Sequence, residues 1–170
     1  MNLLVRSERP ADRLSVRHVN RTAFDTDQEA DLVDALRDSG FAETSLVAVA
    51  DGQLIGHILF SPVSIIDNTV VVPALSLAPM AVAPSHQRQG IGTKLVETGL
   101  ESCRKLGHRI VVVLGDPHFY RRFGFSSEDA RPLKSPFGET DAWMALELIP
   151  GSLNNVKGLV RYAPPFDIFL

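Results

Sequence analysis

The fold is decided by the stretch Leu77–Phe125, which reads LAPMAVAPSHQRQGIGTKLVETGLESCRKLGHRIVVVLGDPHFYRRFGF. An apolar segment leads into a loop that holds Gly90 and Gly92, and apolar residues three or four positions apart then indicate an amphipathic helix. Ile110–Leu114 reads as a strand buried on both faces, because it is wholly apolar and mostly β-branched. The order of strand, glycine loop, helix and strand predicts an α/β domain.

The glycine loop, residues 87–93, is a predicted anion site. The first N–H groups of a helix have no partner within the helix, and the helix dipole adds to their attraction for a phosphate. Gly90 and Gly92 lack a Cβ, so a pyrophosphate can approach the backbone, and Arg88 adds positive charge. The loop is neither a Walker loop nor a dinucleotide fingerprint, which needs a glycine where Leu95 stands. A glycine-rich helix start without a ligand is the alternative.

The rest of the chain alternates helix and strand patterns. Pro10 fits the first turn of a helix that runs towards Phe24. Thr26 and Glu29 have the spacing of a capping box at the start of a second helix, which Gly40 ends. The predicted strands are Leu3–Arg6, Ser45–Ala50, Gln53–Ile66, Val70–Val82, Ile110–Leu114, Trp143–Leu148 and Gly158–Tyr162, with a hairpin turn at Asp51-Gly52.

Composition excludes several classes of protein. A chain of 170 residues fits one domain, residues 1–170, and a net charge of -3 argues against general nucleic-acid binding. A single cysteine, Cys103, cannot form an internal disulfide, so we expect a reducing, cytoplasmic location. No run approaches the roughly 20 apolar residues of a membrane span, and the N-terminus lacks the apolar core of a signal peptide. No spacing indicates a metal site.

Several motifs resemble the GCN5-related N-acetyltransferases, the GNAT family. One is Gln87-x-x-Gly90-x-Gly92 between a strand and a helix; the most specific is Leu114–Phe125, LGDPHFYRRFGF, which resembles a bacterial branch of that family. Gly56–Val63 and Leu148–Gly151 resemble the same branch, so the likeness spans nearly the whole chain. It implies an α/β (α+β) fold of GNAT type, with a mixed, mostly antiparallel sheet splayed between the fourth and fifth strands and helices on both faces.

The resemblance also implies acetyl-CoA as co-substrate and no metal. The coenzyme would lie in a wedge between the strands that end at Val82 and Leu114, which agrees with Pro79 as a residue that ends strand pairing. Its pantetheine arm would pair with the main chain of Met80 and Val82, a form of β-augmentation. The residues expected to contact the coenzyme are Met80, Ala81, Val82, Gln87, Arg88, Gln89, Gly90, Ile91, Gly92, Thr93, Gly115, Phe119 and Tyr120.

Acetyl transfer from a thioester to an amine makes three demands. The amine must be unprotonated, and its pKa is about 10.4. The oxyanion needs a donor, for which the family suggests the amide of Ala81 or Val82. The departing thiolate benefits from a proton, and the family places a tyrosine at the position of Tyr120; a phenol with a pKa of about 10 is protonated at neutral pH and can act as the general acid. The alternative for Tyr120 is a packed helix residue.

The general base is less well specified. Many members of the family carry a glutamate on the fourth strand, but Val70–Val82 has no acidic residue and only Ser76 as a polar side chain. His57 is the candidate base, directly or through water, and the alternative is a strand histidine bonded to its neighbours. Glu29 is a second candidate, although the capping box already accounts for it. A substrate that arrives as the free amine needs no base.

The sequence therefore predicts a single-domain, acetyl-CoA-dependent N-acetyltransferase that acts by direct transfer in a ternary complex. The acceptor is a small-molecule amine or a protein amine; no nucleic acid or membrane partner is expected, and a homodimer fits the family. One alternative is a non-catalytic acyl-CoA-binding or sensor module, which the missing acid favours and the Tyr120 motif disfavours. Another is an acyltransferase that uses a longer acyl-CoA or acylates a protein.

Overall fold

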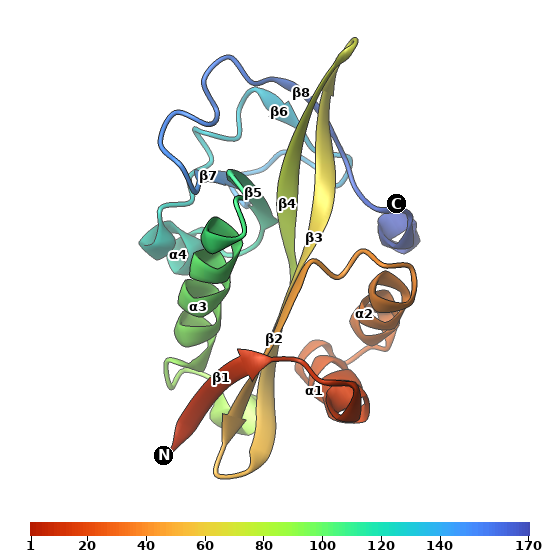
Figure 1. Ribbon diagram of the computed structural model, residues 1–170, viewed down its shortest axis with the longest axis vertical. Helices are drawn as coiled ribbons and strands as arrows, with labels where there is room; N and C mark the ends of the chain where they lie inside the picture. The colour runs from red at the N-terminus through yellow and green to blue at the C-terminus, as the bar shows by residue number, and fades with distance from the viewer. The chain divides into compact units, whose positions relative to one another are not determined.

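The computed structural model describes all 170 residues, whose contacts divide the chain into two compact units. The first unit comprises Met1–Ser61 and Ala78–Ser102, and the second comprises Pro62–Leu77 and Cys103–Leu170. Two long strands, β3 (Gln53–Asp67) and β4 (Val70–Val82), contribute residues to both units (Figure 1). Each unit is described separately below.

In the first unit, three strands pair antiparallel in chain order. Strand β1 (Leu3–Ser7) pairs with β2 (Thr44–Ala50), and β2 pairs with β3. Asp51 and Gly52 join β2 to β3 with φ of 50° and 81°, which is the left-handed backbone that a two-residue hairpin turn requires. The predicted hairpin is thus confirmed.

Two helices of this unit, α1 (Arg13–Phe24) and α2 (Gln28–Asp38), lie together in Figure 1. Pro10 was predicted to open the first helix, and it opens a 3₁₀ turn that leads into α1 at Arg13. The predicted capping box is wrong by one residue, because Asp27 is the N-cap of α2. The Thr26 hydroxyl instead accepts a hydrogen bond from the Gln28 N–H at 3.3 Å and donates one to the Glu29 carboxylate at 2.9 Å.

Helices cover both faces of β3 in the first unit. Successive strand residues point to opposite faces, so some side chains meet one helix and some the other. His57 points towards α1, where the Asn20 amide nitrogen lies 3.1 Å from its Nδ1. Phe60 points towards α3 (Ile91–Lys105), where a Cβ at Gly99 would lie only 2.5 Å from its ring. The close approach of helix and sheet therefore depends on a glycine at position 99.

In the second unit the sheet is mixed. Leu75 and Ser76 of β4 pair parallel with Val111 and Val112 of β5 (Ile110–Leu114), and β5 pairs antiparallel with β7 (Trp143–Glu147). Strand β8 (Gly158–Arg161) pairs antiparallel with β3 and parallel with the short β6 (Leu133–Lys134). The sheet order is β1-β2-β3-β4-β5-β7. All of β5 is buried except Leu114, as the apolar run predicts.

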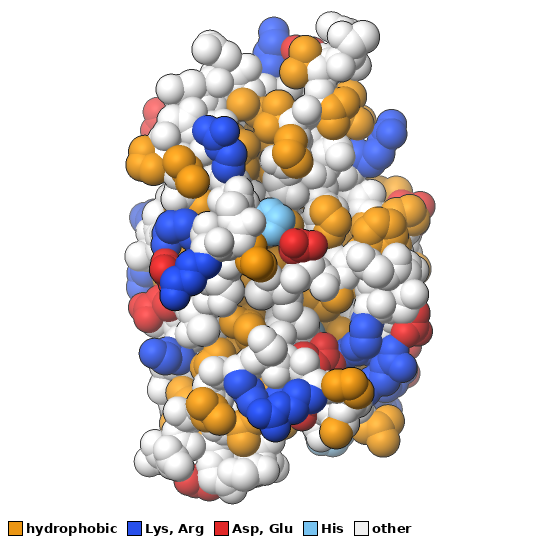
Figure 2. All heavy atoms as spheres, viewed as in Figure 1, with side chains coloured by type: hydrophobic (Ala, Val, Ile, Leu, Met, Phe, Trp, Pro, Cys, Tyr) orange, Lys and Arg blue, Asp and Glu red, His pale blue; other side chains and the backbone are white.

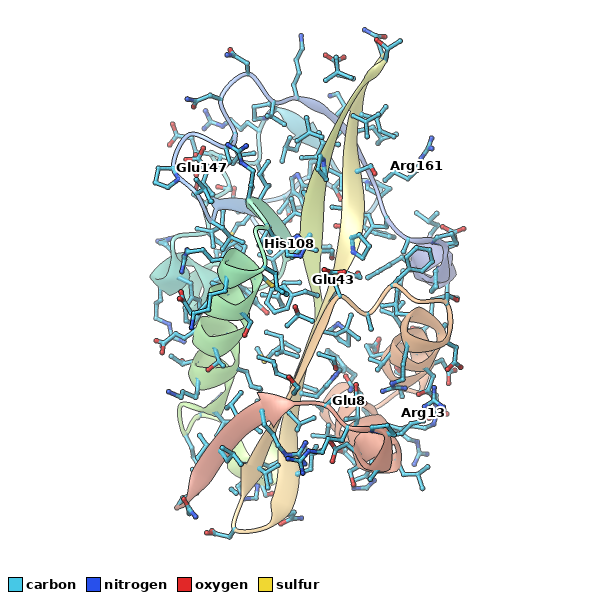
Figure 3. The ribbon with its side chains drawn as sticks, in the orientation of Figure 1. Glu8, Arg13, Glu43, His108, Glu147 and Arg161 are labelled. Carbon is cyan, nitrogen blue, oxygen red and sulfur yellow. The ribbon has the colours of Figure 1, made fainter.

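Short elements complete the second unit. Helix α4 (Pro117–Tyr120) continues into a 3₁₀ turn at Arg121–Phe123, and a 3₁₀ helix at Pro164–Phe169 lies near the C-terminus. The Trp143 indole donates to the Leu133 carbonyl at 3.0 Å inside the core. Glu147, at the end of β7, accepts a hydrogen bond from the Leu153 N–H at 2.7 Å and so holds the chain beyond β7 (Figure 3).

The surface carries charges of both signs. On the face drawn in Figure 2, basic, acidic and hydrophobic side chains are interspersed. None of the helices combines the length and the apolar character that a membrane crossing requires.

Candidate active site

The glycine loop bends sharply between β4 and α3. A 3₁₀ turn at Pro84–His86 follows β4, and α3 begins at Ile91. Arg88 and Gly90 both have left-handed backbones, with φ of 61° and 84°. A Cβ on Gly90 would meet nothing within 4 Å, so the glycine is needed for its backbone angle rather than for space.

Two side-chain hydrogen bonds tie this loop to the end of β4 and to the turn that follows it. The Gln87 amide donates to the Val82 carbonyl at 3.0 Å, and the Gln89 amide donates to the Ser85 carbonyl at 3.3 Å. Ile91 anchors the start of α3 in the core with 1% of its surface exposed. Residues 87–90 are exposed. The loop is therefore a fixed, solvent-facing backbone whose amides precede and open a helix, which suits an anion.

The Tyr120 motif is a self-contained structure in the second unit. Asp116 is the N-cap of α4, since its carboxylate accepts the His118 N–H at 3.0 Å and its carbonyl accepts the Tyr120 N–H at 3.0 Å. The Tyr120 ring packs edge-on against Phe119 at 4.9 Å and against Phe125 at 5.7 Å between centroids. Neither phenylalanine offers the Tyr120 hydroxyl a hydrogen bond.

Tyr120 stays protonated at every physiological pH. It is 8% exposed, and burial raises its pKa above the ordinary value of 10.0, with the Asp116 charge as a second cause. A phenolate in this environment is disfavoured because a buried charge loses its hydration. The side chain therefore carries a neutral hydroxyl that can donate a hydrogen bond.

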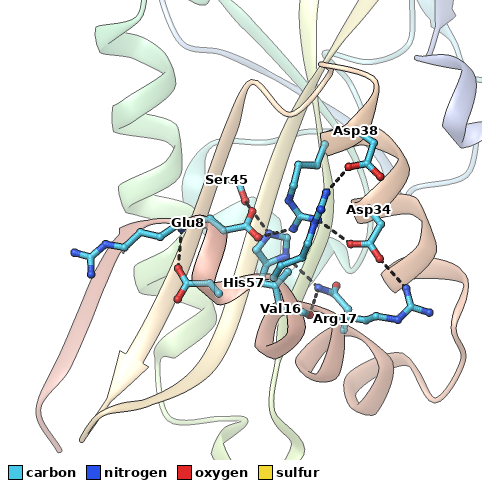
Figure 4. Close-up of polar contacts among 12 residues, drawn as sticks. Glu8, Val16, Arg17, Asp34, Asp38, Ser45 and His57 are labelled. Atoms are coloured by element: carbon cyan, nitrogen blue, oxygen red, sulfur yellow. Dashed lines mark hydrogen bonds and ion pairs between the residues drawn. The ribbon is translucent and has the colours of Figure 1, made fainter.

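His57 lies in a buried polar network of the first unit (Figure 4). Its Nδ1 is 3.1 Å from the Asn20 amide nitrogen, which is a donor, so Nδ1 accepts and the proton sits on Nε2. Nε2 then donates to the Ser45 hydroxyl at 2.9 Å, and that hydroxyl donates to the Glu8 carboxylate at 2.7 Å. Arg37 forms an ion pair with the other carboxylate oxygen of Glu8.

This environment argues against His57 as a general base. The side chain is 0% exposed, and burial lowers its pKa to about 3, helped by the positive charge of Arg37. Both ring nitrogens are already bonded to neighbours. The alternative of a structural strand histidine fits these facts better. The carboxylate of Glu29, the second candidate base, accepts a hydrogen bond from the Thr26 hydroxyl.

Ser76, the polar side chain of strand β4, is paired with a tyrosine that follows β8. Ser76 is 2% exposed and hydrogen-bonds the phenol of Tyr162, whose pKa is raised by burial. The Tyr162 ring lies between Phe137 and Phe166, at 4.9 and 5.0 Å between centroids. Sequence reasoning placed Tyr162 in a strand but had no signal that would connect it with Ser76.

The predicted site residues thus fall into two groups, one in each unit. Met80, Ala81, Val82, the glycine loop and His57 belong to the first unit. Gly115, Phe119 and Tyr120 belong to the second. Sequence reasoning missed Asn20, Ser45 and Glu8 around His57, because these residues come from α1, β2 and the end of β1 and share no motif.

Comparison with known proteins bears on both groups. Residues 13–125 match the Acetyltransferase (GNAT) family. The chain is 38% identical over 169 residues to the uncharacterized N-acetyltransferase YhbS of Escherichia coli K12, covering 98% of this chain and 100% of YhbS. It is also 33% identical over 162 residues to the uncharacterized N-acetyltransferase YjhQ of the same strain, covering 91% and 89% of the two chains.

Two solved structures are similar along nearly the whole chain. The crystal structure of E. coli YhbS in complex with CoA has a TM-score of 0.90 at 38% identity, and the match covers 98% of this chain and 93% of that one. A GNAT family acetyltransferase from Brucella melitensis in complex with acetyl-CoA has a TM-score of 0.81 at 36% identity, with 98% and 99% covered. The predicted fold, an α/β fold of GNAT type with a mixed sheet, is confirmed, and the structure shows that β4 and β5 are a parallel pair within it. This chain belongs to the GNAT family and is an N-acetyltransferase.

Proposed function

We propose that this protein transfers the acetyl group of acetyl-CoA to a primary amine by direct transfer in a ternary complex. The observation that carries the proposal is Tyr120, a tyrosine held by aromatic packing and kept protonated by burial, in the motif where the family resemblance calls for an acid. The relatives that were crystallised with CoA and with acetyl-CoA support the choice of co-substrate.

The glycine loop would bind the coenzyme. Residues 88–93 supply amides at the start of α3, and the exposed guanidinium of Arg88 adds positive charge for a diphosphate. Met80 and Val82 would offer main-chain groups to the pantetheine arm. We take residues 1–170 as a single acyltransferase domain to which both units contribute.

The reaction consumes one proton at sulfur and releases one at nitrogen. The free amine attacks the thioester carbonyl, a C–N bond forms, and the oxyanion would be held by the amide of Ala81 or Val82. The C–S bond then breaks, and Tyr120 gives its proton to the sulfur. Because burial disfavours a lasting phenolate, this step must be coupled to the return of a proton to Tyr120 from the ammonium nitrogen of the intermediate.

The acceptor enters as a free amine in this proposal. Strand β4 has no carboxylate that could serve as a base, and His57 is neutral and enclosed, so neither β4 nor His57 supplies a general base. A small amine or a protein lysine fits equally, and a longer acyl chain would use the same steps. Amines of lower pKa should then react faster at neutral pH, since more of each is unprotonated.

The test is CoA release, followed with a thiol reagent, across a panel of small amines and lysine peptides. We expect acetyl-CoA to raise the melting temperature, because a ligand bound only to the folded state stabilises it, and at least one amine to accelerate release. A rise in melting temperature with no release above the rate without amine would identify a sensor module instead. Parallel assays with longer acyl-CoA thioesters would reveal a different acyl preference.

A further inference from the structure

Gly115, the residue that follows β5, leaves no room for a side chain. A Cβ built on it would lie 2.5 Å from Cε2 of Tyr120, 3.0 Å from Cδ2 and 3.6 Å from Cζ. Carbon atoms of packed side chains are normally about 3.5–4.0 Å apart. Gly115 is not among the glycines with positive φ, so its backbone would accept an alanine. The close approach of the Tyr120 ring is therefore the reason that position 115 requires a glycine.

Neither side of this contact can retreat easily. The Gly115 N–H donates to the Ala142 carbonyl at 3.0 Å, which fixes its backbone. On the other side, the Tyr120 N–H is bonded to the Asp116 carbonyl, and the ring is backed by Phe125, which is 1% exposed. A methyl group at position 115 would therefore push the phenol out of its place.

We propose that Gly115 is a positioning residue for the acid, and that the space it leaves sets where the Tyr120 hydroxyl lies. This inference rests on the proposed function, in which Tyr120 protonates the departing sulfur. It gives Gly115 a role different from the coenzyme contact that the family resemblance implied. Gly115 acts through Tyr120 and needs no contact with the substrate.

The expected effect follows from the size of the displacement. Restoring a normal contact requires a shift of about 1 Å, and a misplacement of that size can lower the rate of a catalysed step about 100-fold. Gly115→Ala should therefore lower kcat by about 10- to 100-fold. Binding of CoA should change little, because the glycine loop is untouched.

The experiment is a double-mutant cycle with Gly115→Ala, Tyr120→Phe and the pair, scored by kcat with the fastest panel amine and by the Kd of CoA. A phenylalanine keeps the ring and its clash but has no hydroxyl to misplace. We expect Gly115→Ala to lower kcat in the wild type and to have no further effect in the Tyr120→Phe background, since residues that act as a unit are not additive.

Gly99→Ala is the matched control. A Cβ there would lie 2.5 Å from the Phe60 ring, the same degree of crowding against an aromatic side chain that has no part in the chemistry. It should lower the melting temperature and leave kcat per folded molecule within about twofold, because general destabilisation does not by itself change the transition state. A loss of kcat equal to that of Gly115→Ala would overturn the inference.

The remaining outcomes separate the two proposals. The role of Gly115 is overturned if Gly115→Ala has the kcat of the wild type. It is also overturned if Gly115→Ala lowers kcat by the same factor in the Tyr120→Phe background. Wild-type kcat in Tyr120→Phe overturns the acid itself. If Gly115→Ala does not fold, the double variant Gly115→Ala/Tyr120→Ala is compared with Tyr120→Ala. With the ring gone, an alanine at 115 should not lower the melting temperature further. A further decrease contradicts the steric link.

Discussion

Tyr120 and His57 are both buried and both kept neutral by burial, yet their surroundings differ. Each ring nitrogen of His57 has a polar side chain beside it, and the network continues through Ser45 to the Glu8–Arg37 ion pair. The Tyr120 ring is held by Phe119, Phe125 and the space at Gly115, and these contacts place its hydroxyl without bonding it.

This difference separates the framework residue His57 from Tyr120, the proposed acid. A buried group whose polar atoms are all bonded to neighbours costs free energy to disturb and has little capacity left for a substrate. A buried ring that is fixed only by apolar contacts can offer its hydroxyl to an incoming atom. A shifted pKa alone would have grouped the two residues together.

The largest effect is expected at Tyr120. Tyr120→Phe removes the proton donor but keeps the ring, so kcat should fall by about 10²- to 10⁴-fold, with the Kd of CoA nearly unchanged. Steady-state kinetics and calorimetric titration measure the two quantities. An unchanged kcat with a weaker affinity for CoA would make Tyr120 a binding residue, and the contrast with His57 would then be wrong.

The next effect is on stability, at His57. The pKa of His57 is lowered to about 3 in the folded state, below its unfolded value of about 6.5. The stability that neutral His57 contributes is therefore complete above pH 6.5. As pH falls towards 3 the free energy of unfolding decreases by up to about 1.4 kcal/mol per pH unit. In His57→Leu the part of this pH dependence that comes from His57 should disappear.

His57→Leu should also be less stable at neutral pH. Asn20 and Ser45 lose a partner, which costs about 1–3 kcal/mol. Denaturant titrations of both proteins between pH 4 and 8 measure the two effects. The turnover of folded His57→Leu should stay within about twofold of wild type, since general-base catalysis would contribute about 10²-fold or more. A larger loss of turnover restores His57 as a base.

A third prediction separates binding from turnover at the glycine loop. Gly90 has φ of 84°, and placing a side chain in this backbone costs about 1–2 kcal/mol. Gly90→Ala should weaken CoA binding about tenfold and change kcat much less. Gly138→Ala is the control, because Gly138 also has positive φ and open space around it but belongs to the second unit. Equal loss of affinity in both variants would contradict a phosphate role for the loop.

The smallest effect concerns Asp12, a simple ion-pair member in the first unit. The hydrogen bond from Arg6 lowers the pKa of Asp12 to about 2 against an unfolded value of about 3.9. The resulting stability is present above pH 4 and is lost as pH falls through 2. Asp12→Asn should cost about 1 kcal/mol at pH 7, and the difference from wild type should shrink as pH falls from 4 and vanish below pH 2. An unchanged difference would mean that the pair stabilises by packing alone.

Most of the fold could be predicted because it depends on local patterns. Apolar periodicity located α3 and β5, and Asp51-Gly52 located the hairpin. The start of α2 was misplaced by one residue because Thr26 and Asp27 are both residue types that favour a helix N-cap, and local pattern fixes a helix end only to within one or two residues.

The candidate site was predicted less completely. Tyr120 and the glycine loop lie in contiguous motifs, so the sequence alone pointed to them. The polar network around His57 draws its residues from α1, from β2 and from the position after β1. The space that Gly115 makes for Tyr120 depends on how the turn after β5 folds back. Such contacts between elements cannot be derived from the spacing of residue types in one sequence.

The most direct measurement is a crystal structure of this protein with CoA bound. We expect the diphosphate oxygens within about 3 Å of main-chain amides between Arg88 and Thr93, and the coenzyme sulfur within hydrogen-bond reach of the Tyr120 hydroxyl. A diphosphate held elsewhere, or a sulfur that faces another side chain while Tyr120 stays enclosed, would contradict the account.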